Sequence, residues 1–135
     1  MSVIGLNHIT LAVADLNRSV QFYRDVLGFH LRALWQDGAY LEAGSLWLCL
    51  SVEPVMSSQI RPDYTHIAFS VADEFYADMN ERVRSCCIIW KDNSSEGDST
   101  YFLDPDGHML ELHLGSLASR LAHYSRHPEK GVSVY

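Results

Sequence analysis

Residues 91–113 read K-D-N-S-S-E-G-D-S-T-Y-F-L-D-P-D-G-H-M-L-E-L-H and predict two short strands joined by a tight turn. In the D-P-D-G turn at 104–107, proline fixes the first turn dihedral and glycine can take a positive φ. Leucines then alternate with Glu111 and His113, so the carboxylate and the imidazole share the face opposite an apolar wall. A buried carboxylate needs a cation, a metal or hydrogen-bond donors. The rest of the chain should supply that partner.

The chain contains an internal repeat. L-N-H-I-T-L-A-V at 6–13 and Y-T-H-I-A-F-S-V at 64–71 place a histidine at the same point of an alternating strand. A helical pattern and three further short strands follow each of these segments. We therefore predict an α+β fold of paired βαβββ modules within one domain, residues 1–135. The first repeat spans about 4–52, a linker spans 53–62, the second repeat spans about 63–115, and a helix and tail occupy 116–135.

The spacing of apolar residues predicts which helix faces are buried. In the helix that begins at Asp73, Phe75 and Val83 are expected to face the core, and Leu117 is expected to do so in the last helix. In the register of the repeat, Cys49 falls where the second half has Glu111. The first half therefore lacks the carboxylate.

Composition limits the class of protein. Ten basic and seventeen acidic residues give a net charge of −7, which argues against a nucleic-acid surface. The apolar runs are too short to span a bilayer, so we expect no membrane partner and a cytoplasmic protein. The three cysteines lack metal-finger spacing, and Cys86 and Cys87 are adjacent and poorly placed to bridge, so reduced thiols are expected.

His8, His66 and Glu111 are the candidate metal ligands. Two imidazoles and one carboxylate, placed by the repeat on the faces opposite the leucines, form a divalent-metal site with open coordination positions. The alternative is that each histidine is hydrogen-bonded in a core and that Glu111 pairs with a cation. Three such residues in repeat positions favour the metal.

Other polar residues suggest ligand contacts. Thr10 shares the face of His8, although it is equally an ordinary strand threonine. The charged and hydroxyl side chains that together would suit a phosphate or phosphonate are Lys91, Ser95, Ser99, Tyr101 and Arg120. The loop at 93–97 could ligate a hard cation through oxygen, or it is simply solvated.

Several motifs together resemble one family. They are N-H-I-T-L-A-V at 7–13, G-A-Y-L-E at 38–42, L-W-L-C-L-S at 46–51, D-Y-T-H at 63–66, S-E-G-D-S at 95–99 and Y-F-L-D-P-D-G-H at 101–108. They resemble the fosfomycin-resistance glutathione transferases, the FosA-type group of the vicinal oxygen chelate superfamily. The resemblance covers nearly the whole chain.

The resemblance implies a domain-swapped homodimer in which His8 of one chain joins His66 and Glu111 of the other around Mn²⁺. The metal would bind fosfomycin and stabilise the alkoxide that forms when glutathione opens the epoxide, which would confer antibiotic resistance. The implied phosphonate contacts are Lys91, Ser95, Ser99, Tyr101 and Arg120, with Thr10 as a donor to the substrate oxygens. Tyr40 would help to ionise the glutathione thiol, Trp47 and Cys49 would wall the pocket, and Trp35 would border the thiol channel. The loop residues Asn93, Ser95, Glu96 and Gly97 would bind K⁺.

Some positions depart from the family pattern. Ser94 stands where relatives usually have a base, and Ile67 and Glu129 stand where they have tyrosine, which affects the glutathione site more than the metal site. Hydrolytic members place a carboxylate near the position of Gly38, so its absence favours thiol addition. Two alternatives within the fold are a ring-cleaving Fe²⁺ dioxygenase and a non-catalytic drug-binding dimer.

Overall fold

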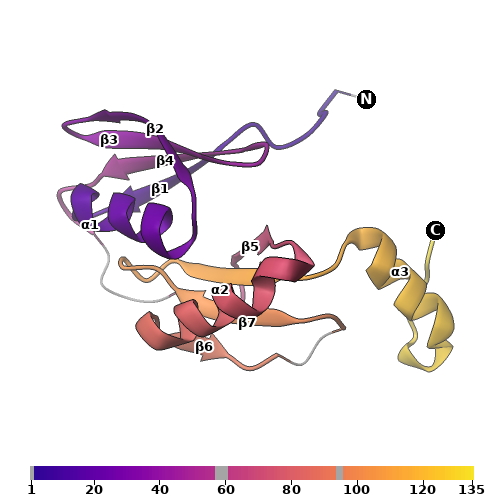
Figure 1. The fold of residues 1–135 in the computed structure, drawn as a ribbon. Coiled ribbons are helices and arrows are strands. Elements are labelled where there is room, and N and C mark those ends of the chain that lie inside the picture. The colour runs from indigo at the N-terminus through magenta and orange to yellow at the C-terminus, as the bar shows by residue number, and fades with distance from the viewer. Residues whose placement is uncertain (1, 57–60, 94–95) are drawn as a thin grey trace. The chain divides into compact units, whose positions relative to one another are not determined.

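The computed structural model describes residues 2–56, 61–93 and 96–135. The chain forms two compact units, and each contains one four-stranded sheet with its own helices (Figure 1). The first unit includes the chain up to residue 65 together with 103–108, and the second consists of 66–102 and 109–135. The α+β fold of two βαβββ halves is confirmed. None of the described helices has the length and apolar character needed to cross a membrane.

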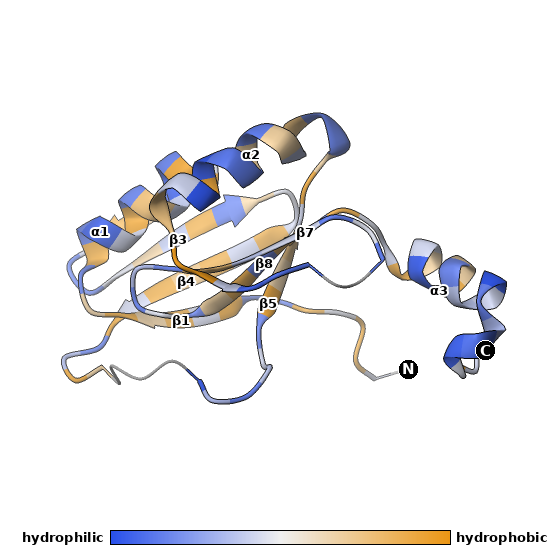
Figure 2. Ribbon diagram, turned by 90° about the horizontal axis from the view of Figure 1, so that it is seen from below, coloured by the Kyte–Doolittle hydropathy of each residue, from blue (hydrophilic) through white to orange (hydrophobic). Residues whose placement is uncertain are grey.

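The sheet of the first unit has the strand order β1-β4-β3-β2. Strand β1 is parallel to β4, and the other neighbours are antiparallel. Alternate residues such as Leu11, Leu41 and Leu48 are buried on the face that α1 covers, which follows from the period of two along a strand (Figures 1 and 2). The elements are β1 Ile9–Val13, α1 Leu16–Gln21, a π-helix Phe22–Val26, β2 His30–Trp35, β3 Gly38–Ala43 and β4 Leu46–Val52.

The helix of the first unit begins after an N-cap at Asp15 and changes form midway. The Asp15 side chain accepts a hydrogen bond from the Arg18 N–H at 3.1 Å. After one and a half turns the helix widens, and the Leu27 N–H donates to the Phe22 carbonyl five residues back at 3.3 Å. This π-helical turn contains the fully buried Tyr23, on the face to which helical spacing assigns it with Leu16, Val20 and Leu27.

The predicted turn between β7 (Ser99–Leu103) and β8 (Met109–His113) is confirmed. Asp104 Oδ1 accepts from the N–H groups of Asp106 and His108, both at 2.9 Å, and Gly107 has φ +84°. Asp104 Oδ2 accepts from the Tyr23 hydroxyl at 2.7 Å. Burial is the main cause that raises the pKa of the Asp104 carboxyl above its usual value, and these hydrogen bonds only partly oppose it.

The tip of this hairpin is bound to the first helix. Asp106 accepts hydrogen bonds from the Ala14 N–H at 3.0 Å, the Ser19 hydroxyl at 3.1 Å and the Arg18 guanidinium at 3.1 Å. The second acid of the D-P-D-G motif is therefore a structural anchor within the first unit.

The second unit repeats the plan of the first, with the strand order β5-β8-β7-β6. Strand β8 runs parallel to β5, and its Leu110 and Leu112 are fully buried, as predicted. The elements are β5 Ile67–Ser70, α2 Asp73–Cys86, β6 Ile89–Lys91, β7 Ser99–Leu103, β8 Met109–His113, α3 Leu117–Arg126 and a 3₁₀ turn Pro128–Lys130.

The strand registers confirm the predicted equivalence of the two halves. Thr10 lies opposite Cys49 in the β1–β4 pair, and Ala68 lies opposite Glu111 in the β5–β8 pair. Thr10 and Ala68 each follow a repeat histidine by two residues. Cys49 therefore occupies the place in the first half that the carboxylate has in the second.

Two burial predictions are wrong. Phe75 of α2 is 57% exposed, although Val83 on the same helix is fully buried. Leu117 of α3 is 75% exposed, and none of the α3 residues is buried, so periodicity identified an apolar stripe without identifying what covers it (Figure 2). In addition, His8 and His66 come just before β1 and β5 and are not within these strands.

Candidate functional site

His66 and Glu111 come together in the second unit. Glu111 lies on β8, only 6% exposed, and His66 directly precedes the neighbouring parallel strand β5. The His66 Nε2 atom is 2.9 Å from Glu111 Oε1. The sequence prediction that these two residues share a site is consistent with this contact.

A hydroxyl and a second imidazole support the same carboxylate. The Ser99 hydroxyl donates to Glu111 Oε2 at 2.6 Å and lies 2.7 Å from His113 Nδ1. Because a hydroxyl has one proton, and Ser99 gives it to the carboxylate, His113 Nδ1 must donate to Ser99 Oγ. Glu111 Oε2 is thereby held in place and Oε1 is directed toward His66.

The spacing of His66 and Glu111 fits a metal ion. Two ligands in adjacent positions of an octahedral ion, each about 2.1 Å from it, would be about 3.0 Å apart. The observed separation is 2.9 Å, which is also the length of an ordinary N–H···O hydrogen bond between the imidazole and the carboxylate. Because the side-chain oxygen of Asn7 accepts from His8 Nδ1 at 2.7 Å, His8 keeps the lone pair of Nε2 for a metal.

The third predicted ligand, His8, belongs to the first unit. Within the described part of a single chain, no three His, Cys, Asp or Glu side chains gather closely enough to hold a metal. His66, just before β5, and Glu111, on β8, are therefore the two predicted metal ligands that a single chain brings together.

An aromatic wall lies beside this pair. The Tyr101 ring is 6.0 Å from the His66 ring, and Lys91 Nζ lies 4.8 Å from the centre of the Tyr101 ring. Trp90 lies 5.5 Å from His66 and 5.0 Å from Tyr101, and its indole N–H donates to the carbonyls of Phe102 and Leu110. Sequence reasoning missed Trp90, although its place next to Lys91 in a predicted strand was a usable signal.

The predicted cation loop is tied to the last helix. The Asn93 side chain donates to the Gly97 carbonyl at 2.9 Å. The Arg120 guanidinium donates to the Glu96 carboxylate and to the Glu96 carbonyl, both at 3.2 Å. Arg120 therefore sits against the loop predicted to bind a cation. Ser94 and Ser95 lie outside the described residues.

The remaining predicted residues share the open face of the first sheet. Thr10, Cys49 and Tyr40 form a row across β1, β4 and β3, because Cys49 lies opposite both of the others. Aromatic rings continue along the same face: Trp35 is 4.8 Å from Tyr40, Tyr40 is 5.2 Å from Trp47, and Trp47 is 4.6 Å from His8. This face carries several aromatic rings around a phenol and a thiol, and Glu42 lies opposite Trp47 in the β3–β4 pair.

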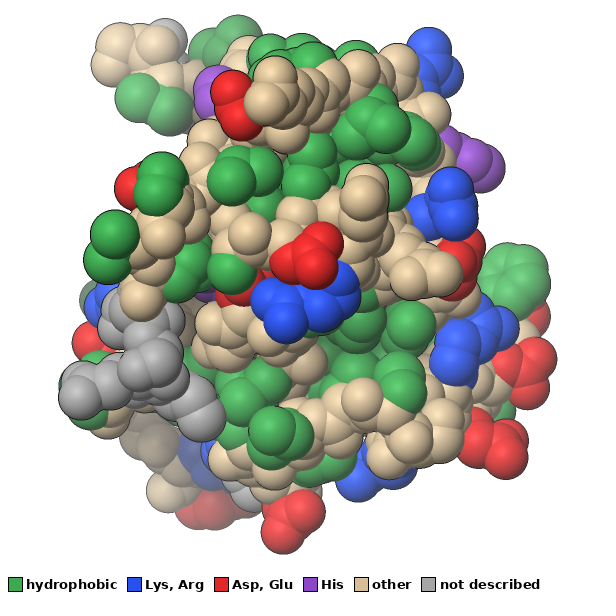
Figure 3. Space-filling model, turned by 90° about the vertical axis from the view of Figure 1, so that its left-hand side faces the viewer, with side chains coloured by type: hydrophobic (Ala, Val, Ile, Leu, Met, Phe, Trp, Pro, Cys, Tyr) green, Lys and Arg blue, Asp and Glu red, His purple; other side chains and the backbone are tan. Residues whose placement is uncertain are grey.

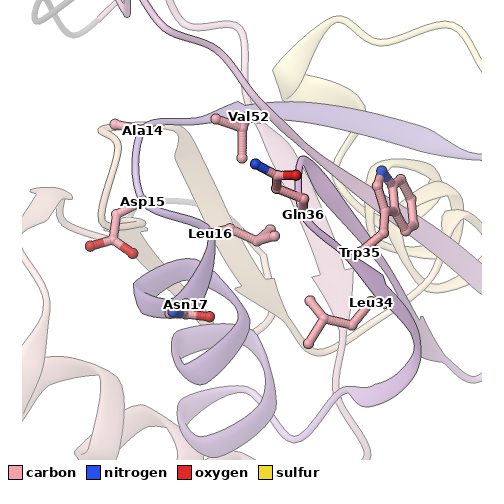
Figure 4. A pocket seen from close by; sticks show the side chains of 8 residues that line it. All are labelled: Ala14, Asp15, Leu16, Asn17, Leu34, Trp35, Gln36 and Val52. Atoms are coloured by element: carbon pink, nitrogen blue, oxygen red, sulfur yellow. The ribbon is translucent and has the colours of Figure 1, made fainter.

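A pocket of about 620 Å³ lies elsewhere in the first unit. It is lined by residues 14–17, 34–36 and Val52 (Figure 4). Trp35 is the one predicted site residue in its lining. The pocket therefore does not coincide with the row of Thr10, Cys49 and Tyr40.

Gly38 lies under the Trp35 ring. A Cβ at this position would come within 2.5 Å of Trp35 Cζ2 and 2.8 Å of the Leu50 carbonyl oxygen. A carboxylate side chain therefore does not fit here unless the backbone or the indole moves.

Charge is mixed over the surface. Acidic and basic side chains lie among apolar ones on the face seen in Figure 3.

Known proteins resemble this chain along most of its length. Residues 5–112 match the Glyoxalase/Bleomycin resistance protein/Dioxygenase superfamily. The chain is 51% identical to glutathione transferase FosA of Serratia marcescens over 132 residues, which cover 95% of this chain and 93% of the relative. It is 41% identical over 130 residues to metallothiol transferase FosB of Shouchella clausii strain KSM-K16, covering 92% and 89% of the two chains.

A solved structure has the same fold. The fosfomycin resistance protein FosX of Listeria monocytogenes, complexed with Mn(II) and a sulfate ion, superposes with a TM-score of 0.79 at 32% identity, covering 90% of this chain and 98% of that one. The chain belongs to the Glyoxalase/Bleomycin resistance protein/Dioxygenase superfamily.

Proposed function

We propose that this protein is an Mn²⁺-dependent transferase that adds the thiol of glutathione to the epoxide of fosfomycin and thereby confers resistance to the antibiotic. The observation that carries the proposal is the 2.9 Å contact between His66 and Glu111 in a chain 51% identical to a glutathione transferase FosA. Relatives named as fosfomycin resistance proteins and metallothiol transferases support it over a ring-cleaving dioxygenase.

His66 and Glu111 would hold the Mn²⁺ together with His8 of the partner subunit in a domain-swapped homodimer. The FosX structure with Mn(II) supports the choice of metal. When bound, the ion would act as a Lewis acid on the epoxide oxygen. Ser99 and His113 keep the Glu111 carboxylate oriented before any ligand arrives, so little reorganisation is needed on binding.

The phosphonate of fosfomycin would be bound by Lys91, Tyr101 and Arg120, with Ser95 and Thr10 completing the donors. The Ser99 hydroxyl donates its one proton to Glu111, so a Ser99 contact to the phosphonate would require that hydrogen bond to be exchanged. The Tyr101 ring lies beside His66 and Lys91 Nζ lies over the Tyr101 ring, which supports their roles. The sulfate in the FosX structure is likewise an oxyanion. Arg120 is bound to Glu96, so its positive charge is fixed at the edge of the loop that we propose for K⁺, formed by Asn93, Ser95, Glu96 and Gly97.

The open face of the first sheet would receive glutathione. Tyr40 lies between the rings of Trp35 and Trp47, where its hydroxyl could donate a hydrogen bond to the glutathione sulfur and so favour the nucleophilic thiolate. Cys49 and Trp47 would form the wall. The close approach of Trp35 to Gly38 leaves no room for a carboxylate that would activate water, which supports thiol addition over hydrolysis.

The test is an assay of purified protein with Mn²⁺, fosfomycin and glutathione, followed by mass spectrometry of the product. We expect the glutathione adduct, lost on chelation and reduced at least about 100-fold by Glu111→Gln, which removes a ligand charge but keeps the side-chain shape. Glu81→Gln is the matched control because Glu81 is exposed on α2, which contributes no residue to the metal site or the glutathione site. A diol product, or an adduct that forms equally well without metal, would contradict the proposal.

A further inference from the structure

Two thiols lie side by side at the end of α2. Cys86 is the last residue of the helix and is exposed, and Cys87 caps the helix and is half-buried. Their sulfur atoms are 3.5 Å apart. The Cys86 thiol also contacts the Arg82 carbonyl at 3.2 Å. The proposed transferase function gives neither thiol a role.

The pair is poorly suited to a disulfide. A trans peptide places adjacent Cα atoms about 3.8 Å apart, whereas disulfides usually join Cα atoms about 4.4–6.8 Å apart. A bond between Cys86 and Cys87 would therefore be strained and easily reduced, so the pair is expected to remain a dithiol in a reducing setting.

The same geometry suits one atom that bridges both sulfurs. If that atom lies about 2.3 Å from each sulfur, as in zinc thiolates, a sulfur separation of 3.5 Å gives an angle of about 100° at the bridging atom. This angle is close to that of a tetrahedral or pyramidal centre. We propose that Cys86 and Cys87 form a binding site for a soft, thiophilic centre, either a trivalent arsenical or a soft divalent cation.

The binding step balances without an oxidant. With a monosubstituted arsenoxide, two S–H bonds and the arsenic–oxygen double bond break, two As–S bonds form, and the two protons leave with the oxygen as water. Arsenic stays trivalent. A cation such as Cd²⁺ would instead displace two protons and take both thiolates. Soft centres such as trivalent arsenic and Cd²⁺ prefer thiolates to the histidine and carboxylate of the Mn²⁺ site.

Two attached thiols should retain the ligand better than free monothiols. When one As–S bond breaks, the second sulfur stays nearby at a high effective concentration and the bond re-forms. Glutathione offers one thiol per molecule, so millimolar glutathione should not remove the ligand. A small dithiol such as 2,3-dimercaptopropanol should remove it.

The experiment uses the full chain, reduced and loaded with Mn²⁺, and phenylarsine oxide as the probe. Intact mass spectrometry and fluorescence titration should show one arsenical per chain, with water released. Cys86→Ser and Cys87→Ser should each weaken binding at least about 100-fold, since either change leaves one thiol. Cys49→Ala is the matched control and should bind as the unmodified protein does, because Cys49 lies on the first sheet.

Two results would overturn the proposal. The first is binding that survives Cys86→Ser or Cys87→Ser. The second is binding that millimolar glutathione abolishes.

Discussion

Replacing Ser99 by alanine should weaken Mn²⁺ binding in the absence of any substrate. The Ser99 hydroxyl is 3% exposed and donates to Glu111 Oε2 at 2.6 Å, a short bond to a charged acceptor. Without it, the nearest remaining support for that oxygen is His113 Nδ1 at 3.3 Å. The carboxylate would then rotate among orientations of which only some direct Oε1 toward His66.

The size of the effect follows from the type of bond. Hydrogen bonds to charged groups contribute about 1.5–3 kcal/mol, and each 1.4 kcal/mol corresponds to a factor of ten in affinity. Ser99→Ala should therefore raise the Kd for Mn²⁺ by about 10- to 100-fold, the range found when groups behind metal ligands are removed.

The assay is calorimetric titration of metal-free protein with Mn²⁺, without fosfomycin or glutathione. Ser85→Ala is the matched control because Ser85 is an exposed serine on α2 of the same unit. If Ser99→Ala binds Mn²⁺ as tightly as the parent and loses only fosfomycin affinity, Ser99 acts on the substrate alone and the argument from Glu111 orientation is refuted.

Three further predictions concern assembly and stability. His8→Ala and Glu111→Gln should each inactivate the protein. An equal mixture of the two variants, allowed to exchange subunits, should recover about a quarter of the parent activity, because half of the dimers are mixed and each mixed dimer has one intact site of two. If no activity is recovered, the two subunits do not share sites. Asp104→Ala should lower the free energy of unfolding by about 3 kcal/mol through lost hydrogen bonds, whereas Asp104→Asn should be mild. Because burial raises the pKa of Asp104, this carboxyl contributes most to the free energy of unfolding when it is protonated, and the contribution falls as pH rises through the folded-state pKa. Denaturant titrations should therefore show that the free energy of unfolding of Asp104→Asn increases relative to that of the parent as pH rises. Gly38→Ala should lower the free energy of unfolding by about 1–3 kcal/mol, because the added methyl group overpacks against Trp35. The loss should be smaller in a Trp35→Ala background. An unchanged Tm would contradict the close contact.

Much of the second unit could be predicted because strand alternation is a local property. The period of two placed Glu111 and His113 on one face, and the repeat placed Cys49 at the position of the carboxylate, which the strand registers confirm. The D-P-D-G turn was also predictable, since proline and glycine restrict or free the backbone at particular positions.

Hydrogen-bond partners could not be predicted in the same way. Ser99 was expected only to contact a ligand, and its bonds to Glu111 and His113 depend on how β7 and β8 pair. Periodicity also predicted that Leu117 would be buried, whereas it is exposed in the single chain, because an apolar stripe does not reveal which surface covers it. The role of Asp106 as an anchor for the first helix likewise needed the structure.

The binding of the hairpin tip in the first unit has a consequence for attempts to dissect the protein. Residues 103–108 belong to the first unit although they lie far along the chain from its other members. A gene cut in the linker at 53–62 would yield an N-terminal fragment without the acceptor groups of Asp104 and Asp106, leaving buried donors such as the Tyr23 hydroxyl without acceptors. The two halves, although built alike, should therefore be recovered as folded proteins only when co-expressed.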